Sequence, residues 1–141
     1  MTQESVDILL VEDNPDDADL TIRTLRKHHL SNALRHVRDG EEALRFLLGP
    51  EAASPLPRLV ILDLKLPKVD GFEVLRALRA DPRTKTVPVV VMTSSREDKD
   101  LEKCYELGTN SYVVKPIEFG DFAEAVARLG LYWILTNSVP R

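Results

Sequence analysis

Residues 59–71 read LVILDLKLPKVDG, and in this stretch a run of four apolar residues, LVIL, ends abruptly at Asp63. Three other short apolar runs end in the same way: ILLV before Glu12 and Asp13, VPVVVM before Thr93, and SYVV before Lys115. Short apolar runs of this kind are typical of buried parallel strands. Because open parallel sheets bind ligands outside the carboxyl ends of their strands, we expect these polar side chains to converge at one edge of a sheet.

Amphipathic stretches lie between the apolar runs, and this alternation predicts an α/β fold built from strand–helix units. The expected strands cover residues 7–12, 33–37, 58–63, 87–92 and 111–114. The expected helices cover residues 15–29, 41–48, 71–80, 97–107 and 118–135. The first helix has the clearest start, with Asn14 as the N-cap and Pro15 at the first helical position. The pattern therefore predicts a parallel sheet with its connecting helices packed against it.

Length and composition indicate one domain and exclude several kinds of partner. The chain has 141 residues, and 19 Lys and Arg against 23 Asp and Glu give a formal charge of −4, which argues against a broad electrostatic grip on nucleic acid or on an anionic membrane. The apolar stretch at 129–135 is far shorter than the ~20 residues that a membrane helix requires. The acidic N-terminal MTQESVD does not resemble a signal peptide, and the single cysteine excludes an internal disulfide. We therefore expect a cytoplasmic protein.

Glu12, Asp13 and Asp63 would repel one another in a shared crevice. Two unit charges ~4 Å apart repel by ~4 kcal/mol at an effective dielectric constant near ~20, so a shared proton or a cation must offset the repulsion. Hard oxygen ligands in an open site suit Mg²⁺, which binds through one or two carboxylates together with phosphate oxygens of a substrate. This set predicts a phosphoryl group on an aspartate nucleophile, with the Lys115 ammonium and the Thr93 hydroxyl contacting the phosphoryl oxygens.

Four segments resemble the motifs of the receiver domain of two-component response regulators. They are EDN at 12–14, LDLKLPKVDG at 62–71, TSS at 93–95 and KP at 115–116. Their order along the chain is highly specific, and the resemblance covers nearly the whole chain. It implies a doubly wound five-stranded parallel sheet of flavodoxin-like order 2-1-3-4-5, with helices on both faces. It also implies a single receiver domain over residues 1–141 with no separate output domain.

The resemblance assigns a role to each matched residue. Asp63 is the implied phosphoacceptor, and Thr93 and Lys115 assist the transfer. The implied ligands of Mg²⁺ are Glu12, Asp13, Asp63 and the backbone carbonyl of Lys65. Tyr112 matches the aromatic residue whose rotation accompanies the movement of Thr93 toward the phosphoryl group, so Thr93 and Tyr112 are the implied switch residues. The protein is then no enzyme in the usual sense, but a phosphoacceptor that assists its own phosphorylation and dephosphorylation.

Other segments resemble one subgroup of receivers, the small single-domain regulators that pair with phytochrome-type histidine kinases. These segments are the long loop before the third strand, YELGTNSYVVKP at 105–116, and the aromatic tail LYWIL at 131–135. The implied partner is a sensor histidine kinase of phytochrome type, and the implied result of phosphorylation is altered partner binding or dimerisation. The tail departs from the Phe-Trp-Leu core of the subgroup, since it reads Tyr132, Trp133 and Ile134.

The apolar end of the last helix leaves two arrangements open. The residues at 131–135 are apolar all round the helix, so they must be covered either by their own domain or by a second copy of the chain. Aromatic residues are favoured in the cores of interfaces, and we therefore expect a homodimer through the C-terminal region.

Two other classes of function share parts of the site pattern. A haloacid dehalogenase-like phosphatase also uses a strand-end Asp, a Thr or Ser, a Lys and magnesium. It needs a second Asp two residues after the nucleophile as acid and base, where this chain has Lys65. A scaffold with the shape of a receiver but no phosphorylation is the second alternative, and the complete set of acidic residues argues against it.

The histidines and the cysteine carry weaker signals. His28, His29 and His36 show no metal-ligand spacing on a shared face, so we expect ordinary solvated residues. Cys104 lies on the apolar stripe of its helix with Leu101, and we expect it in the core.

Overall fold

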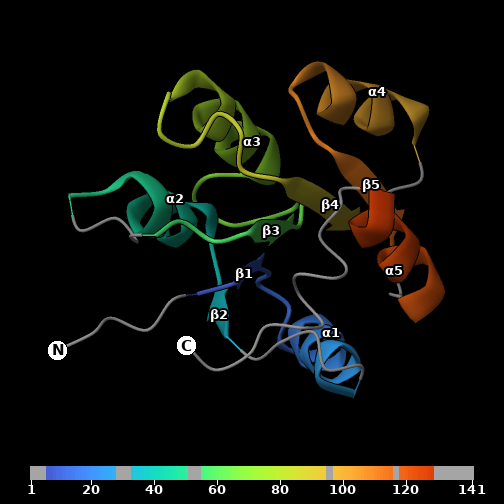
Figure 1. Ribbon diagram of the computed structural model, residues 1–141. Coiled ribbons are helices and arrows are strands. Elements are labelled where there is room, and N and C mark those ends of the chain that lie inside the picture. The colour runs from blue at the N-terminus through green and yellow to red at the C-terminus, as the bar shows by residue number, and fades with distance from the viewer. Residues whose placement is uncertain (1–5, 28–32, 51–54, 95–96, 116–117, 129–141) are drawn as a thin grey trace, which may run out of the picture.

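The computed structural model describes residues 6–27, 33–50, 55–94, 97–115 and 118–128. The sheet at its centre has five strands in the order β2-β1-β3-β4-β5, and all four neighbouring pairs are parallel (Figure 1). The strands are β1 (Ile8–Val11), β2 (Leu34–Val37), β3 (Leu59–Leu62), β4 (Val89–Thr93) and β5 (Ser111–Val114). The predicted flavodoxin-like sheet is therefore confirmed.

The helices form two layers around the sheet. They are α1 (Pro15–Lys27), α2 (Gly40–Leu48), α3 (Gly71–Ala80), α4 (Asp98–Glu106) and α5 (Phe119–Arg128). Figure 1 shows α2, α3 and α4 on one face and α1 and α5 on the other. Alternate residues of each strand point to opposite faces, so Leu9 packs with α2 and α3 while Ile8 packs with α1. Both faces are covered, which is why β1 and β3 are apolar at every position.

The strand order reverses between β1 and β3, and this point positions the site. Val11 pairs with Leu62, so the two strands end at the same level. The Asp63 N–H continues the ladder by donating to the Val11 carbonyl over 3.1 Å. The residues that follow both strands therefore emerge side by side at the edge where open parallel sheets hold their ligands.

Side-chain caps begin the helices that follow β1, β2 and β3. The Asn14 side-chain oxygen accepts from the N–H groups of Asp16 and Asp17 at 2.9 and 3.0 Å, which confirms the predicted N-cap of α1. Asp39 caps α2 and Asp70 caps α3 by accepting from N–H groups three residues further on, at 2.7 and 3.0 Å. Each helix is thereby fixed to the end of the strand or loop that precedes it.

The fourth strand begins later than its sequence suggests. Residues 87–92 were the expected strand, whereas β4 covers Val89–Thr93. Pro88 has no N–H to donate to the ladder, although its carbonyl accepts from Val60 N–H at 2.9 Å. The strand also includes Thr93, which is therefore held by the sheet rather than by the loop that follows it.

Several predictions concern residues beyond the described ranges. The C-terminal tail at 131–135, on which the expected homodimer rests, lies outside them, as do His28 and His29. Cys104 is fully buried within the cluster on the α2–α3–α4 face, as predicted. Over the described parts of the chain, no helix has the length and apolar character needed to span a bilayer.

Candidate phosphorylation and metal site

Three carboxylates converge where β1 and β3 end. Glu12, Asp13 and Asp63 each offer an oxygen atom, and these atoms all lie within 4.8 Å of one another. Glu12 and Asp63 are buried, with 1% and 7% of their surface exposed, whereas Asp13 is exposed. The crevice is thus closed at its floor and open to solvent on the side of Asp13.

The ammonium of Lys115 lies among these acids. Its Nζ donates to Glu12 Oε1, to Asp63 Oδ2 at 2.9 Å and to Asp17 Oδ2 at 3.0 Å. An ammonium has three N–H donors, so three carboxylates satisfy it completely. The backbone N–H of Lys115 donates to the Thr93 carbonyl at 2.8 Å, so the hydrogen bonding between β4 and β5 continues one residue beyond β5. This bond fixes the backbone from which the Lys115 side chain reaches the crevice. The cation required by the repelling carboxylates is therefore supplied by the chain itself.

Burial and charge act on Glu12 and Lys115 in different ways. Burial raises the pKa of Glu12 to about 7, since desolvation outweighs the hydrogen bond from Lys115 and the charge of Asp63 acts in the same direction. Burial alone would lower the pKa of Lys115, but hydrogen bonds to Glu12, Asp63 and Asp17 raise it above its ordinary value. Lys115 is thus a permanent cation, while Glu12 changes charge near neutral pH.

Two glycines shape the loop that follows Asp63. A Cβ on Gly71 would lie 2.3 Å from the Asp63 carbonyl oxygen, and a Cβ on Gly40 would lie 1.8 Å from the Val69 carbonyl oxygen. Only glycine allows the N-termini of α2 and α3 to approach the loop this closely. Lys68, in the same loop, has a φ of 67°, a left-handed conformation that is uncommon outside glycine. The loop therefore holds Lys65 in a defined position, with its N–H 3.4 Å from Asp63 Oδ1.

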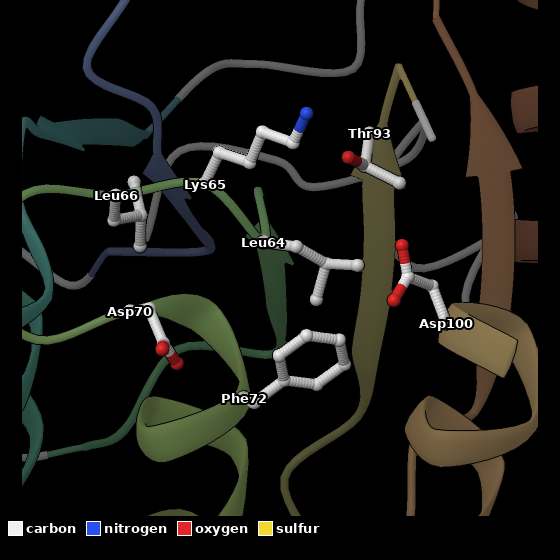
Figure 2. Close-up of a pocket in the computed structure, with 7 residues that line it drawn as sticks. All are labelled: Leu64, Lys65, Leu66, Asp70, Phe72, Thr93 and Asp100. Atoms are coloured by element: carbon white, nitrogen blue, oxygen red, sulfur yellow. The ribbon is translucent and has the colours of Figure 1, made fainter. Parts of the chain in front are cut away.

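Thr93 and Lys65, the second residue after Asp63, line one pocket. Figure 2 shows this pocket of about 350 Å³ between the β3–α3 loop, the end of β4 and α4. The Phe72 ring and Leu64 lie in its interior, opposite the Asp100 carboxylate of α4 (Figure 2). Its lining residues are Leu64, Lys65, Leu66, Asp70, Phe72, Thr93 and Asp100. A movement of the Thr93 side chain would therefore change a wall that β4 shares with α4.

Tyr112 lies apart from the acids. It is half-buried on β5, paired with Val91 of β4, and packs against the core cluster on the α2–α3–α4 face. The structure thus brings together Glu12, Asp13, Asp63 and Lys115, and it places Thr93 and Tyr112 along β4 and β5 beside them.

Two contacts in the site were missed by sequence reasoning. The sequence motifs assign Asp17 no role in the site, yet its Oδ2 accepts a hydrogen bond from Lys115 Nζ. Helical spacing held the missing signal, because Thr21 and Leu25, one and two turns later, are both buried. His36 was expected to be solvated, but it is half-buried, and its Nε2 donates to the Glu12 carbonyl over 2.7 Å. Its place opposite Leu10 in the β1–β2 pairing explains this contact.

The donor set fits a hard divalent cation. It consists of carboxylate oxygens of Glu12, Asp13 and Asp63 at two adjacent strand ends. Oxygen ligands of this kind suit Mg²⁺ or Mn²⁺, which keep water in part of their coordination shell. The exposed side chain of Asp13 leaves room for that water.

Comparison with known proteins gives a consistent family. The sequence profile described as response regulator receiver domain matches residues 8–127. The probable methanogenesis regulatory protein FilR2 of Methanothrix harundinacea is 42% identical over 134 residues, covering 94% of this chain and 86% of FilR2. Response regulator Rcp1 of Synechocystis sp. is 38% identical over 135 residues, covering 94% of this chain and 92% of Rcp1.

Solved structures agree with the sequence relatives. The bacteriophytochrome response regulator RtBRR superposes with a TM-score of 0.83 at 45% identity, over 97% of this chain and 85% of RtBRR. The Mn²⁺-bound form of Rcp1 superposes with a TM-score of 0.74 at 36% identity, over 98% of this chain and all of that chain. The profile match and these relatives together show that the chain belongs to the response regulator receiver family, with stand-alone phytochrome response regulators among its close relatives.

Proposed function

We propose that this protein is a single-domain response regulator that accepts a phosphoryl group from a histidine kinase onto Asp63. The observation that carries the proposal is the position of the Asp63 carboxylate. It is buried at the end of β3, 2.9 Å from the Lys115 ammonium, and shares the crevice with Glu12 and Asp13. The Asp63 carboxylate thus has a fixed cation on one side, and the crevice is open to solvent on the other. This arrangement suits attack of a carboxylate oxygen on a phosphorus atom.

In the proposed transfer, one Asp63 oxygen attacks the phosphorus of a phosphohistidine. A new O–P bond forms, the P–N bond breaks, and its electron pair returns to the imidazole nitrogen of the donor. The Lys115 ammonium pairs with a phosphoryl oxygen, and the Thr93 hydroxyl donates to another. Positioning and charge stabilisation of this kind supply most of the catalysis in phosphoryl transfer.

Glu12, Asp13, Asp63 and the carbonyl of Lys65 are the proposed ligands of Mg²⁺. When bound, Mg²⁺ would supply positive charge that reduces the repulsion between the Asp63 carboxylate and the phosphoryl oxygens. Glu12 must be deprotonated to serve as a ligand, which links metal binding to its pKa of about 7.

We propose a kinase of phytochrome type as the phosphoryl donor. RtBRR is a bacteriophytochrome response regulator, and its structure superposes on 97% of the chain described here. FilR2, which carries the name of a methanogenesis regulator, matches 94% of this chain, so a kinase that responds to a stimulus other than light is the alternative donor.

The proposed output is a change of surface on the α4–β5–α5 side. Thr93 moves toward the phosphoryl group and Tyr112 follows it, which alters the surface around α4 and biases partner binding or dimerisation. In this proposal the 141 residues act as one receiver unit in the cytoplasm, without nucleic-acid or membrane binding. The predicted homodimer through the C-terminal region remains part of it.

Phosphorylation by acetyl phosphate tests the proposal directly. Wild type, Asp63→Asn and the control Asp16→Asn are incubated with acetyl phosphate and Mg²⁺, and their intact masses are measured. We expect wild type and Asp16→Asn to gain one phosphoryl group that hydroxylamine removes, because acyl phosphates are labile to this nucleophile. Asp63→Asn should gain none.

Three results would reject the proposal. Equal labelling of Asp63→Asn would show that another residue accepts the phosphoryl group. No labelling of wild type would indicate a scaffold that has the shape of a receiver but is not phosphorylated. Continuous turnover of phosphate esters without a stable adduct would instead support a phosphatase.

A further inference from the structure

We infer that Asp17 is a positioning residue for the proposed transfer: it retains the Lys115 ammonium at the site when Glu12 and Asp63 bind a metal. The inference rests on the proposed function. It concerns a residue of α1 that lies outside the cluster formed by Glu12, Asp13 and Asp63 among the described residues.

Two of the three partners of Lys115 have a second task. Glu12 and Asp63 belong both to the set that holds the ammonium and to the set that can hold a cation. A carboxylate oxygen that ligates a dication is a much weaker acceptor for an ammonium, because its charge is already compensated. Asp17 bonds Lys115 but is not part of the carboxylate cluster found among the described residues.

Lys115 needs such a partner because it cannot move freely into water. Its side chain is only 11% exposed, and burying an ammonium without an anionic partner is unfavourable. The Asp17 side chain is 41% exposed, so it can follow a small movement of the ammonium while remaining paired. Lys115 would thereby stay beside Asp63, ready for the phosphoryl oxygen.

The start of α1 fixes Asp17 for this task. Its N–H donates to the Asn14 side chain at 3.0 Å, and its position on the helix faces inward, one turn before buried Thr21. Asp16, the preceding residue, shares the same cap but is exposed, and so is Leu20, one turn later. Asp16 therefore provides a control with the same charge, the same helix turn and no contact with Lys115 in the described structure.

Metal affinity measured without any phosphoryl donor tests the inference. Mn²⁺ is titrated into each protein, and the free ion is followed by electron paramagnetic resonance. We expect Asp17→Asn to weaken Mn²⁺ binding by about threefold, the size of effect that one partly exposed ion pair gives. Asp16→Asn should change the affinity by less than half as much, and Asp17→Glu should restore it.

A double-mutant cycle separates positioning from simple loss of negative charge. In a Lys115→Gln background there is no ammonium to hold, so Asp17→Asn should no longer affect Mn²⁺ affinity. An unchanged threefold loss in that background would mean that Asp17 acts on the metal through its charge, and would overturn the inference. Thermal unfolding of each variant shows that the comparison is made between folded proteins.

The outcomes distinguish this inference from the proposed function. If wild type binds Mn²⁺ and Asp17→Asn behaves like Asp16→Asn, the inference is wrong while labelling of Asp63 still stands. If the effect of Asp17 depends on Lys115 but Asp63 accepts no phosphoryl group, the positioning of Lys115 holds and the proposed function fails. Absence of Mn²⁺ binding by wild type would overturn both.

Discussion

Glu12 has two opposite requirements in the proposed function, since burial favours its neutral form and the proposed metal binding requires its charged form. Its pKa is raised from 4.5 to about 7 in the folded chain, so the folded state binds this proton more tightly than the unfolded state does. Between these two pH values the folded state holds more protons, and the free energy of unfolding therefore decreases as pH rises. The stabilisation from the protonated form is complete below the unfolded pKa and is lost by about pH 7.

The first prediction is a pH-dependent stability that Glu12→Gln removes. Without divalent cations, we expect Glu12 to lower the free energy of unfolding by roughly 1–3 kcal/mol between pH 4.5 and pH 7. Glu12→Gln cannot ionise, so its stability should depend less on pH by that amount. Urea unfolding of both proteins at the two pH values measures the difference, and identical slopes would contradict the prediction.

Among the structural elements, α2 depends on the absence of a side chain at its first residue. A Cβ at Gly40 would lie 1.8 Å from the Val69 carbonyl oxygen, and backbone cannot yield as a flexible side chain can. We expect Gly40→Ala to destabilise the protein by more than about 2 kcal/mol in urea unfolding.

Gly120→Ala is the matched control for this prediction. Apart from its chain neighbours and the backbone of α5 itself, no heavy atom of the described residues lies within 4 Å of the position that its Cβ would occupy, so alanine should be neutral or stabilise the helix by about 0.5 kcal/mol. A small and similar effect of both substitutions would show that α2 can shift away from the β3–α3 loop.

Arg79 connects α3 to the loops that precede β4 and β5. Its guanidinium donates to the carbonyls of Gly108 and Val87 at 2.8 and 2.7 Å, and to the Asn110 side chain at 2.9 Å. We expect Arg79→Ala to cost about 2–4 kcal/mol of stability, because partly buried acceptors lose a charged donor. Arg76→Ala removes only an exposed pair with Glu73 and should cost less than about 0.5 kcal/mol. Equal shifts of the urea midpoint for the two variants would exclude this role.

On the scale of the whole molecule, Cys104 reports whether the core opens. It is fully buried, and burial together with the charge of Asp100 raises its pKa to about 11. Because the thiolate is the reactive form, we expect native protein to react with iodoacetamide at least about a hundredfold more slowly than unfolded protein. Alkylation followed by mass spectrometry in buffer and in urea measures the ratio. Similar rates in both would mean that α4 detaches readily from the sheet.

The fold could be predicted from the sequence because buried strands and buried helix faces produce regular patterns of apolar residues. The LVIL run predicted a strand at 58–63, and β3 covers Leu59–Leu62. Apolar periodicity also predicted the burial of Cys104, and the preference of helix starts for Asn followed by Pro predicted the cap at Asn14. Strand-end residues could also be assigned to one site, since parallel strands present their carboxyl ends together.

Contacts between distant elements could not be predicted in the same way. Periodicity tells which face of an element is buried, but it does not tell which side chain of another element meets it. Asp17 and Lys115, 98 positions apart, meet because the fold brings the start of α1 to the residue that follows β5, and the contact of His36 with the Glu12 carbonyl depends on strand register. The approach of Gly40 to Val69 likewise appears only in three dimensions.

The pairing of Glu12 with Lys115 has a consequence for how the protein is made. The two residues lie 103 positions apart, and every carboxylate of the crevice precedes the lysine in the order of synthesis. A nascent chain that has not yet released β5 from the ribosome therefore carries a cluster of uncompensated anions at the end of its first and third strands. Arrival of the last strand of the sheet supplies the counter-ion, so the charge of this crevice is compensated only after β5 has left the ribosome.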